Sequence, residues 1–388
     1  MKKLFIILGL VLIGLLLTAA APLGAVNSLS AAPKETVKKD FEVKPGGKVV
    51  IDLKTGAGIE IQGWEKDLLS AEAVYDTEEI EFRFQKNGNT VEIVSEYKTR
   101  KKNQNSSAKL ILHIPAKFDV DFNTMGGGVT ISYVEGKMVG KTMGGALDLR
   151  NLKGYLDVTT MGGAITLKDS EVDGRAKTMG GEVLVENVKG DVNASSMGGK
   201  VQHKNVSGKA KSVGNEVDIS TMGGALDIDR APNGAKLKTM GGEITINYAG
   251  KFLDAETMGG DINAKEVDGW IKAKTMGGDI EAKMVGDPKE GNRDVKLTSM
   301  GGDITLVVPN GLSMDIDIEI AYPKNSRKEF EDCKIISDFK IDETRTTEWE
   351  RKNGNSERKY IYGKGSVNGG KNKIIIKTIN GNVYLKKG

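Results

Sequence analysis

The chain has 388 residues, with 56 lysines and arginines against 53 aspartates and glutamates. This near balance of charge excludes a strongly basic nucleic-acid-binding protein and leaves no overall attraction to an anionic membrane. Glycine is abundant at 50 residues, and aromatic residues make up only 5%. This composition favours a narrow β-solenoid, whose thin core holds aliphatic side chains but few rings, over a wide globular core.

Residues 1–25 are typical of an export signal. Two lysines precede an apolar run over 4–17, and the small residues of 18–25 include a workable cleavage site. The alternative is an uncleaved anchor, because residues 4–26 are just long enough to span a bilayer of about 30 Å. No cysteine follows the apolar run, which excludes a lipoprotein anchor. We expect a protein exported to the cell surface or periplasm, with residues 26–40 as a linker.

Residues 41–120 predict an N-terminal β cap. Strand-like segments lie at 49–53 and 58–61, and a hairpin over 79–94 turns at an Asn-Gly pair. A basic polar loop follows over 98–109. It is a candidate binding loop, with Lys98, Arg100, Lys101 and Lys102 as its candidate residues.

Residues 121–306 contain ten copies of the tetrapeptide Thr/Ser-Met-Gly-Gly. Seven of the nine intervals between the methionines are 18 residues long, and the other two are 25 and 24. A fixed period of this kind indicates one supersecondary unit stacked on itself, with like side chains in columns. The repeat methionines are Met125, Met143, Met161, Met179, Met197, Met222, Met240, Met258, Met276 and Met300.

Each repeat has the pattern of two strands and two bends. The positions four and six residues after the methionine are aliphatic, with His203 as the one exception, and so is the third position before it in eight copies. The spacing of two predicts strands with one buried face. The parity changes across Met-Gly-Gly, so we expect a bend there at which paired glycines supply positive φ angles. A second bend is expected at motifs such as Val134-Glu135-Gly136.

We therefore predict an all-β, single-stranded β-solenoid with one 18-residue coil per repeat and β-rich caps at both ends. Parallel coils would repeat every ~4.8 Å, with threonines in a hydroxyl ladder and methionines filling the corner. The alternative is an antiparallel meander with Gly-Gly hairpin turns. That arrangement gives no reason for identical columns at a period of 18, so the solenoid is favoured.

The two longer intervals predict interruptions of the stack. Residues 212–215 are a degenerate copy of the repeat, and residues 287–292 are expected to form a protruding loop. Solenoids accept insertions at bends because the strand stack is untouched. The second loop is a candidate binding loop, with Asp287, Lys289 and Glu290 as its candidate residues.

Residues 307–388 predict a C-terminal β cap, with a charged stretch over 324–359 and strand-like residues over 373–385. Caps are expected because an open solenoid exposes strand edges that would polymerise. The only cysteine, Cys333, lies in this cap. We expect it to be a small buried apolar residue, with no internal disulfide.

These motifs together resemble the bacterial DUF4097 family of β-strand repeat proteins, also called toastrack-like or adhesin-like. The resemblance covers roughly residues 41–388 and ends in Thr378-Ile379-Asn380-Gly381-Asn382-Val383. It implies a β-solenoid in the cell envelope and carries over no catalytic residue. The near-perfect Thr-Met-Gly-Gly departs from the looser repeats of that family.

The sequence contains no recognisable reaction centre. His113 lies in a predicted strand and His203 in a core column, so both are expected to be structural, and no zinc cluster or catalytic triad can be assembled. We expect no enzyme activity, no cofactor and no metal site. Acidic residues that follow Gly-Gly are expected to form a solvated edge. The alternative is an active site, because some extracellular β-helices cleave polysaccharides with clustered carboxylates. The acidic residues in question are Glu182, Glu243, Asp261, Asp279 and Asp303.

Three function classes remain. The first is a structural or adhesive envelope protein whose regular faces make many weak contacts with an envelope polymer or a surface protein. The second is an envelope-stress sensor or binding module that acts through a cap or an inserted loop. The third is a self-assembling scaffold, which would need a bare end. We favour the first, with no nucleic-acid partner and with membrane contact only through the signal segment if it is uncleaved.

Overall fold

The computed structural model describes residues 34–99, 108–207, 216–326, 329–351 and 356–388. Within them lie 30 strands and one short 3-10 helix. The signal and most of the linker, the loop residues 100–107 and the degenerate copy at 212–215 lie outside the described residues.

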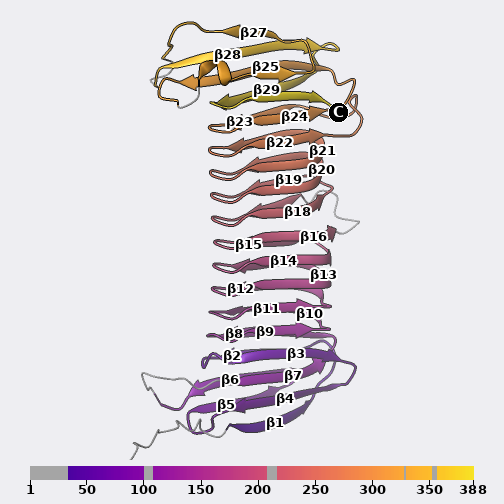
Figure 1. The fold of residues 1–388 in the computed structure, drawn as a ribbon. Coiled ribbons are helices and arrows are strands. Elements are labelled where there is room, and N and C mark those ends of the chain that lie inside the picture. The colour runs from indigo at the N-terminus through magenta and orange to yellow at the C-terminus, as the bar shows by residue number, and fades with distance from the viewer. Residues whose placement is uncertain (1–33, 100–107, 208–215, 327–328, 352–355) are drawn as a thin grey trace, which may run out of the picture. The chain divides into compact units, whose positions relative to one another are not determined.

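The repeats form the predicted parallel solenoid. Each coil contributes one strand to each of two parallel sheets. The register between coils is 18 residues, as in Glu135↔Lys153 and Leu147↔Ile165. Across the two longer intervals it is 25 and 24 residues, as in Val201↔Leu226 and Ile280↔Ile304. Figure 1 shows these strands stacked one above another between β8 and β24. This register excludes the antiparallel meander.

The strand bounds follow the repeat. The strands of the stack are β8 (Phe118–Thr124), β9 (Val129–Ser132), β10 (Glu135–Thr142), β11 (Leu147–Arg150), β12 (Lys153–Thr160), β13 (Ile165–Thr178), β14 (Val183–Lys189), β15 (Val192–Ser196), β16 (Val201–Ser207), β17 (Val217–Ser220), β18 (Leu226–Ala231), β19 (Ala235–Lys238), β20 (Ile244–Glu256), β21 (Ile262–Thr275), β22 (Ile280–Met284), β23 (Val295–Ser299) and β24 (Ile304–Val308). The three longest, β13, β20 and β21, run on around the second bend and serve both sheets.

The three predicted core columns are confirmed. Their aliphatic side chains are at most 4% exposed, as in Ile165, Leu167 and Val158. The threonine or serine before each methionine also points inward and is at most 6% exposed. Alternation along the strands thus places four side-chain columns in one continuous core.

The inward hydroxyls hold neighbouring coils together through the backbone. The Thr160 hydroxyl donates to the Gly145 carbonyl oxygen of the coil before at 2.8 Å and accepts a bond from the Gly163 N–H at 3.2 Å. The same pair of contacts recurs at Thr178, Thr239 and Thr257. The ladder of threonines therefore links neighbouring coils from hydroxyl to carbonyl oxygen.

The expected role of the paired glycines is wrong. None of the Met-Gly-Gly glycines has a positive φ; those angles occur at the second bend, on Gly136, Gly154, Gly174 and Gly190. The second glycine is needed for close approach instead. A Cβ on Gly163 would lie 2.1 Å from the Gly145 oxygen, whereas one on Gly162 would keep ordinary contact at 3.6 Å.

The expected position of the methionines is also wrong. All ten point outward and are 39–54% exposed. The strand alternation explains this orientation, because the preceding threonine points inward and the next side chain along an extended strand must face the other way. The threonine, not the methionine, fills the corner.

The predicted β-rich caps are present at both ends of the stack, and both contain antiparallel strands. At the N-terminal end, β2 and β3 add a parallel coil beneath β8 and β9, and β1, β4 and β5 pair antiparallel beyond them. These strands are β1 (Glu35–Glu42), β2 (Gly47–Leu53), β3 (Gly58–Trp64), β4 (Leu68–Tyr75), β5 (Ile80–Asn87), β6 (Thr90–Tyr97) and β7 (Lys109–Pro115).

At the C-terminal end the chain returns to extend its own stack. Strands β29 and β30 form a further coil on β23 and β24, and β28 pairs antiparallel with β25 and β27. The elements here are β25 (Met314–Pro323), the helix η1 (Phe330–Asp332), β26 (Ile335–Ser337), β27 (Asp342–Arg345), β28 (Arg358–Val367), β29 (Asn372–Ile379) and β30 (Val383–Lys387). Cys333 is buried at 1% exposure, as expected.

The outermost strands carry charge. Strand β1 has the sequence ETVKKDFE and β27 has DETR, and most of their residues are exposed. Charged edge strands discourage the pairing of one molecule with the next.

Candidate functional site

The most regular exposed feature is the row of methionines at the Met-Gly-Gly bends, which we call the methionine edge. It comprises the ten repeat methionines and no other residue. Backbone hydrogen bonds hold the bends in register: the Met161 N–H donates to the Thr142 oxygen and the Met240 N–H to the Met222 oxygen, both at 3.2 Å. The edge is therefore a continuous row of half-exposed thioethers on a rigid support.

Acidic residues flank one part of this edge. Glu243, Asp261, Asp279 and Asp303 each follow a methionine by three residues on consecutive coils. The Asp261 carboxylate accepts the Asp279 N–H at 2.8 Å, and the Asp279 carboxylate accepts the Asp303 N–H at 2.7 Å. The carboxylates of Asp261 and Asp279 are thus each bonded to the next coil, whereas Glu182, which also follows Gly-Gly, lies outside this run of consecutive coils.

Lysines on the outer face of the preceding strands form only a broken column. Lys238 and Lys274 both pair with Glu256, with nitrogen–oxygen distances of 3.4 and 3.5 Å. Burial raises the pKa of Glu256, but the attraction of the two lysines outweighs it, and the net direction is downward. One glutamate thus interrupts the lysine column and offsets its charge.

A shallow hollow lies on the methionine edge where the first long interval interrupts the repeat. It measures about 290 Å³, and Met197, Met222 and Met240 line it together with Lys177 and Lys238. Ser195, Ser196, Ser220 and Thr221 complete its lining. Three exposed methionines of consecutive coils thus lie among hydroxyl and ammonium groups here.

The inserted loop near residue 290 is held by a residue that the sequence did not single out. Arg293 is 4% exposed; its guanidinium bonds to the Asp268 carboxylate at 2.6 Å, to the Val285 oxygen at 2.6 Å and to the Glu290 oxygen at 3.0 Å. An insertion that contains arginine gives no periodic signal, so sequence reasoning missed this anchor.

The candidate residues of this loop lie at its surface. Asp287, Lys289 and Glu290 are exposed, and the Asp287 carboxylate accepts the Lys289 N–H at 2.9 Å. A hollow of about 430 Å³ beside the loop is lined by Glu290, Arg293, Tyr248 and Lys251 among others. The structure brings Glu290 to a concave surface, whereas Asp287 and Lys289 are not part of its lining.

The candidate loop at 98–109 is described only at its ends. The Lys98 ammonium donates to the Thr77 oxygen at 2.6 Å, and the Lys98 N–H donates to the Glu79 oxygen. Arg100, Lys101 and Lys102 lie outside the described residues.

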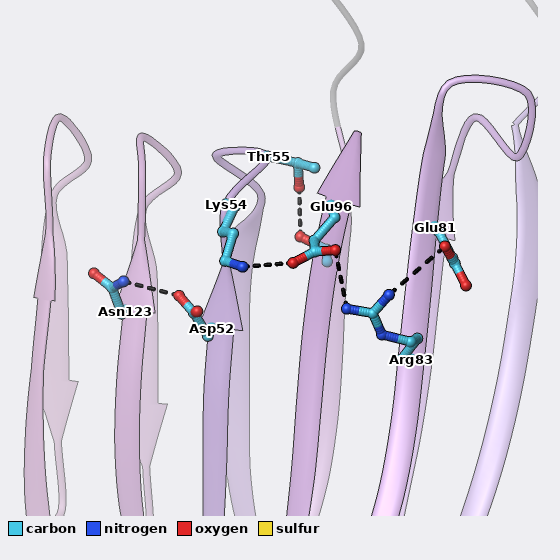
Figure 2. Close-up of polar contacts among 8 residues, drawn as sticks. Asp52, Lys54, Thr55, Glu81, Arg83, Glu96 and Asn123 are labelled. Atoms are coloured by element: carbon cyan, nitrogen blue, oxygen red, sulfur yellow. Dashed lines mark hydrogen bonds and ion pairs between the residues drawn. The ribbon is translucent and has the colours of Figure 1, made fainter. Parts of the chain in front are cut away.

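A polar network joins neighbouring strands of the N-terminal cap (Figure 2). Glu96 on β6 accepts bonds from Lys54 at the end of β2 and from Arg83 on β5, the latter at 2.9 Å. The bond to Lys54, followed by that to Arg83, lowers the pKa of Glu96, and the bond to Glu96 raises the pKa of Lys54. Asn123 donates to Asp52 at 2.8 Å one strand further on. The network ties cap strands to the first coil, which is a structural role.

The histidines have the structural positions expected of them. His113 is half-buried and stacks on Trp64, with ring centroids 5.1 Å apart. His203 is 3% exposed, and neither ring nitrogen has a hydrogen-bond partner among the described residues. Burial lowers the pKa of His203 to about 4.

Two further searches cover only the described part of the chain. Within it, no three His, Cys, Asp or Glu side chains are placed to hold a metal ion together. Within it, too, no helix has the length and apolar character needed to cross a membrane.

The chain is similar to one family model and to several solved structures. The model described as Toastrack DUF4097 matches residues 47–386. No curated protein matches the chain. A "putative adhesin" from Parabacteroides merdae is 13% identical and has a TM-score of 0.33, with 68% of this chain and 96% of that one covered.

Two structures from Parabacteroides distasonis are similar at the same level. A "putative adhesin" is 14% identical, with a TM-score of 0.30 and coverage of 71% of this chain and 96% of that one. A "putative lipid binding protein" is also 14% identical, with a TM-score of 0.26 and coverage of 70% and 96%. Similarities of this size carry no functional assignment to this chain.

Proposed function

Since the chain belongs to the Toastrack DUF4097 family, we propose that it is an exported, non-enzymatic β-solenoid of the cell envelope with a structural or adhesive role. The observation that carries the proposal is the repetition of one exposed surface over ten coils, with the methionine edge in register throughout. A partner that binds the methionine of one coil weakly meets another methionine on the next.

Repetition of this kind favours a polymeric or multivalent partner. When contacts are linked along one rigid support, each further contact is intramolecular, and overall avidity can exceed the single-site affinity by 10²–10⁴. An envelope polymer or a surface protein that presents repeated groups fits this geometry. The charged sequence at the start of the chain, followed by an apolar run, supports export.

The test is protease accessibility of a C-terminally tagged form on intact cells, compared with cells whose outer layer has been permeabilised. Digestion on intact cells would place the solenoid outside and support adhesion. A periplasmic protein of known protease sensitivity serves as the control for cell integrity. Protection until permeabilisation would contradict the adhesive role.

One observation favours the binding-module alternative. The buried Arg293 fixes the inserted loop beside a hollow to which Glu290 and Lys251 contribute charge. Replacement of 287–292 by a short glycine linker tests it. If envelope signalling or partner capture is lost while the melting temperature of the solenoid is kept, the loop rather than the repeated surface carries the function.

A further inference from the structure

We propose that the methionine edge binds soft monovalent metal ions of the Cu(I) and Ag(I) class through its thioether sulfurs. Nothing in the adhesive or structural role requires such a site. The inference therefore goes beyond the proposed function and stands or falls independently of where the chain is located.

Packing does not account for methionine at these ten positions. The side chains are 39–54% exposed, whereas three other methionines of the chain, Met138, Met284 and Met314, are at most 2% exposed and fill the core. A core methionine fills gaps by its flexibility. An outward methionine that faces solvent on one side contributes much less to packing.

The chain itself builds a related bend without sulfur, in which Asn380 replaces the first glycine and has a positive φ of 61°, unlike the Met-Gly-Gly glycines. In the coil formed by β29 and β30, the Thr378 hydroxyl donates to the Gly302 oxygen at 2.6 Å, as Thr160 does to Gly145. Ile379 follows Thr378 in the place that methionine occupies after the other threonines. An apolar residue without a donor atom is therefore compatible with the hydroxyl contact that this bend shares with the others.

The spacing of the coils suits two-coordinate binding. Strands of neighbouring coils lie ~4.8 Å apart, so methionine side chains in the same rotamer repeat at that distance. Zinc–thiolate bonds are about 2.3 Å long, and an ion held in line by two sulfurs at a similar bond length needs them about 4.6 Å apart. Thioether sulfur is a soft donor that selects Cu(I) over hard cations. Adjacent methionines thus bracket a soft ion with no movement of the backbone.

The charges around the edge favour cation binding at its C-terminal part. Met240, Met258, Met276 and Met300 are each followed after three residues by a carboxylate. The lysines on this part, Lys238 and Lys274, are both paired with Glu256. The corresponding positions after Met125, Met143 and Met161 are Gly128, Ala146 and Ala164. We therefore expect the four C-terminal methionines to bind more tightly than the N-terminal ones.

The experiment is a titration of the full chain with Ag(I) in chloride-free buffer, followed by calorimetry. Ag(I) has the ligand preference of Cu(I) without its redox chemistry. Substitution of the four C-terminal methionines by leucine, a nearly volume-conserving change, should abolish the tightest phase of binding. The same substitution of Met125, Met143 and Met161, which have no carboxylate at that position, should lower the number of ions bound and leave the tightest phase in place.

The buried methionines provide the matched control. Replacement of Met138, Met284 and Met314 by leucine removes sulfur from the core only and should leave the Ag(I) isotherm unchanged. Methyl-labelled methionine NMR on the unsubstituted chain gives a second measurement that needs no variant. The ten edge methyl signals should shift with Ag(I), while the three core signals stay in place.

Two results would overturn the proposal. One is an Ag(I) isotherm that is the same for the unsubstituted chain and for the variant that lacks the C-terminal methionines, with circular dichroism showing both to be folded. The other is an NMR titration in which the edge methyl signals do not move. Protection of the chain from protease on intact cells would contradict the adhesive role but would not change its Ag(I) binding. The two proposals can therefore fail separately.

Discussion

The two glycines of each Met-Gly-Gly bend should respond in opposite ways to an added methyl group. At Gly163, a Cβ would lie 2.1 Å from the Gly145 oxygen and 2.3 Å from its carbonyl carbon. Neighbouring coils would have to separate by roughly 1 Å to reach a contact of about 3 Å, and backbone atoms cannot rotate away as a side chain does. We expect Gly163→Ala to cost about 3 kcal/mol or more, at the upper end of overpacking effects.

Gly162→Ala is the matched control in the same bend. Its Cβ would meet the Gly144 oxygen at 3.6 Å, an ordinary contact, and the φ of Gly162 is not in the left-handed region. The change should be neutral or stabilise by about 0.4–1 kcal/mol, because alanine restricts the unfolded chain more than glycine does.

The assay is urea unfolding followed by circular dichroism, with midpoints compared among the two variants and the unsubstituted chain. Midpoints are preferred to extrapolated free energies because repeat stacks can unfold in more than one step. We expect a lowered midpoint for Gly163→Ala only. Equal midpoints for the two variants, or a larger loss for Gly162→Ala, would refute the close-approach account of this bend.

Three further changes test the core columns, the hydroxyl ladder and the buried histidine. Ile244→Asp places an unpaired charge in the core, where Ile244 is fully buried, and should cost several kcal/mol of stability. Its control, Lys238→Ala on the outer face, should shift the melting temperature little. Equal melting temperatures for the two variants would refute the column assignment. Thr160→Val keeps the shape but removes both hydroxyl bonds, so a loss of about 1–3 kcal/mol is expected in urea unfolding. His203 stays neutral in the folded chain until the pH falls to its pKa of about 4, whereas in the unfolded chain it takes up a proton near the ordinary histidine pKa of 6.5. Stability from this group is present above pH 6.5 and falls by about 3 kcal/mol as pH drops to 4. His203→Leu should remove that acid-induced loss in thermal melts at pH 7 and pH 4, and an unchanged pH dependence would contradict the account.

Several features of the fold could be predicted because they depend on alternation along a strand. The columns that contain Ile165, Leu167 and Val158 were assigned to the core from spacing alone, and burial confirms them. The parallel register of 18 followed from the identity of the repeats, since like residues stack only if one repeat makes one coil. The inward position of Thr160 followed from the same parity.

The candidate site was less predictable, because the orientation and the contacts of its residues depend on neighbouring coils. The methionine was assigned to the corner by its flexibility, yet the parity that places Thr160 inside requires Met161 to face outward. Arg293 gave no signal because its partner Asp268 lies on the coil before, 25 residues earlier in the chain. The Lys238–Glu256–Lys274 contacts likewise join successive coils.

The sequence by itself determined the period, the strand count of each coil and the buried face, because these depend on residues two and 18 positions apart. Only the tertiary structure decided which atoms meet between coils. The second glycine is required because the carbonyl of the coil before lies where a Cβ would be, and the methionines form an exposed row because the coils stack in register. Both features depend on distances between neighbouring coils, and the order of residues along one repeat does not determine those distances.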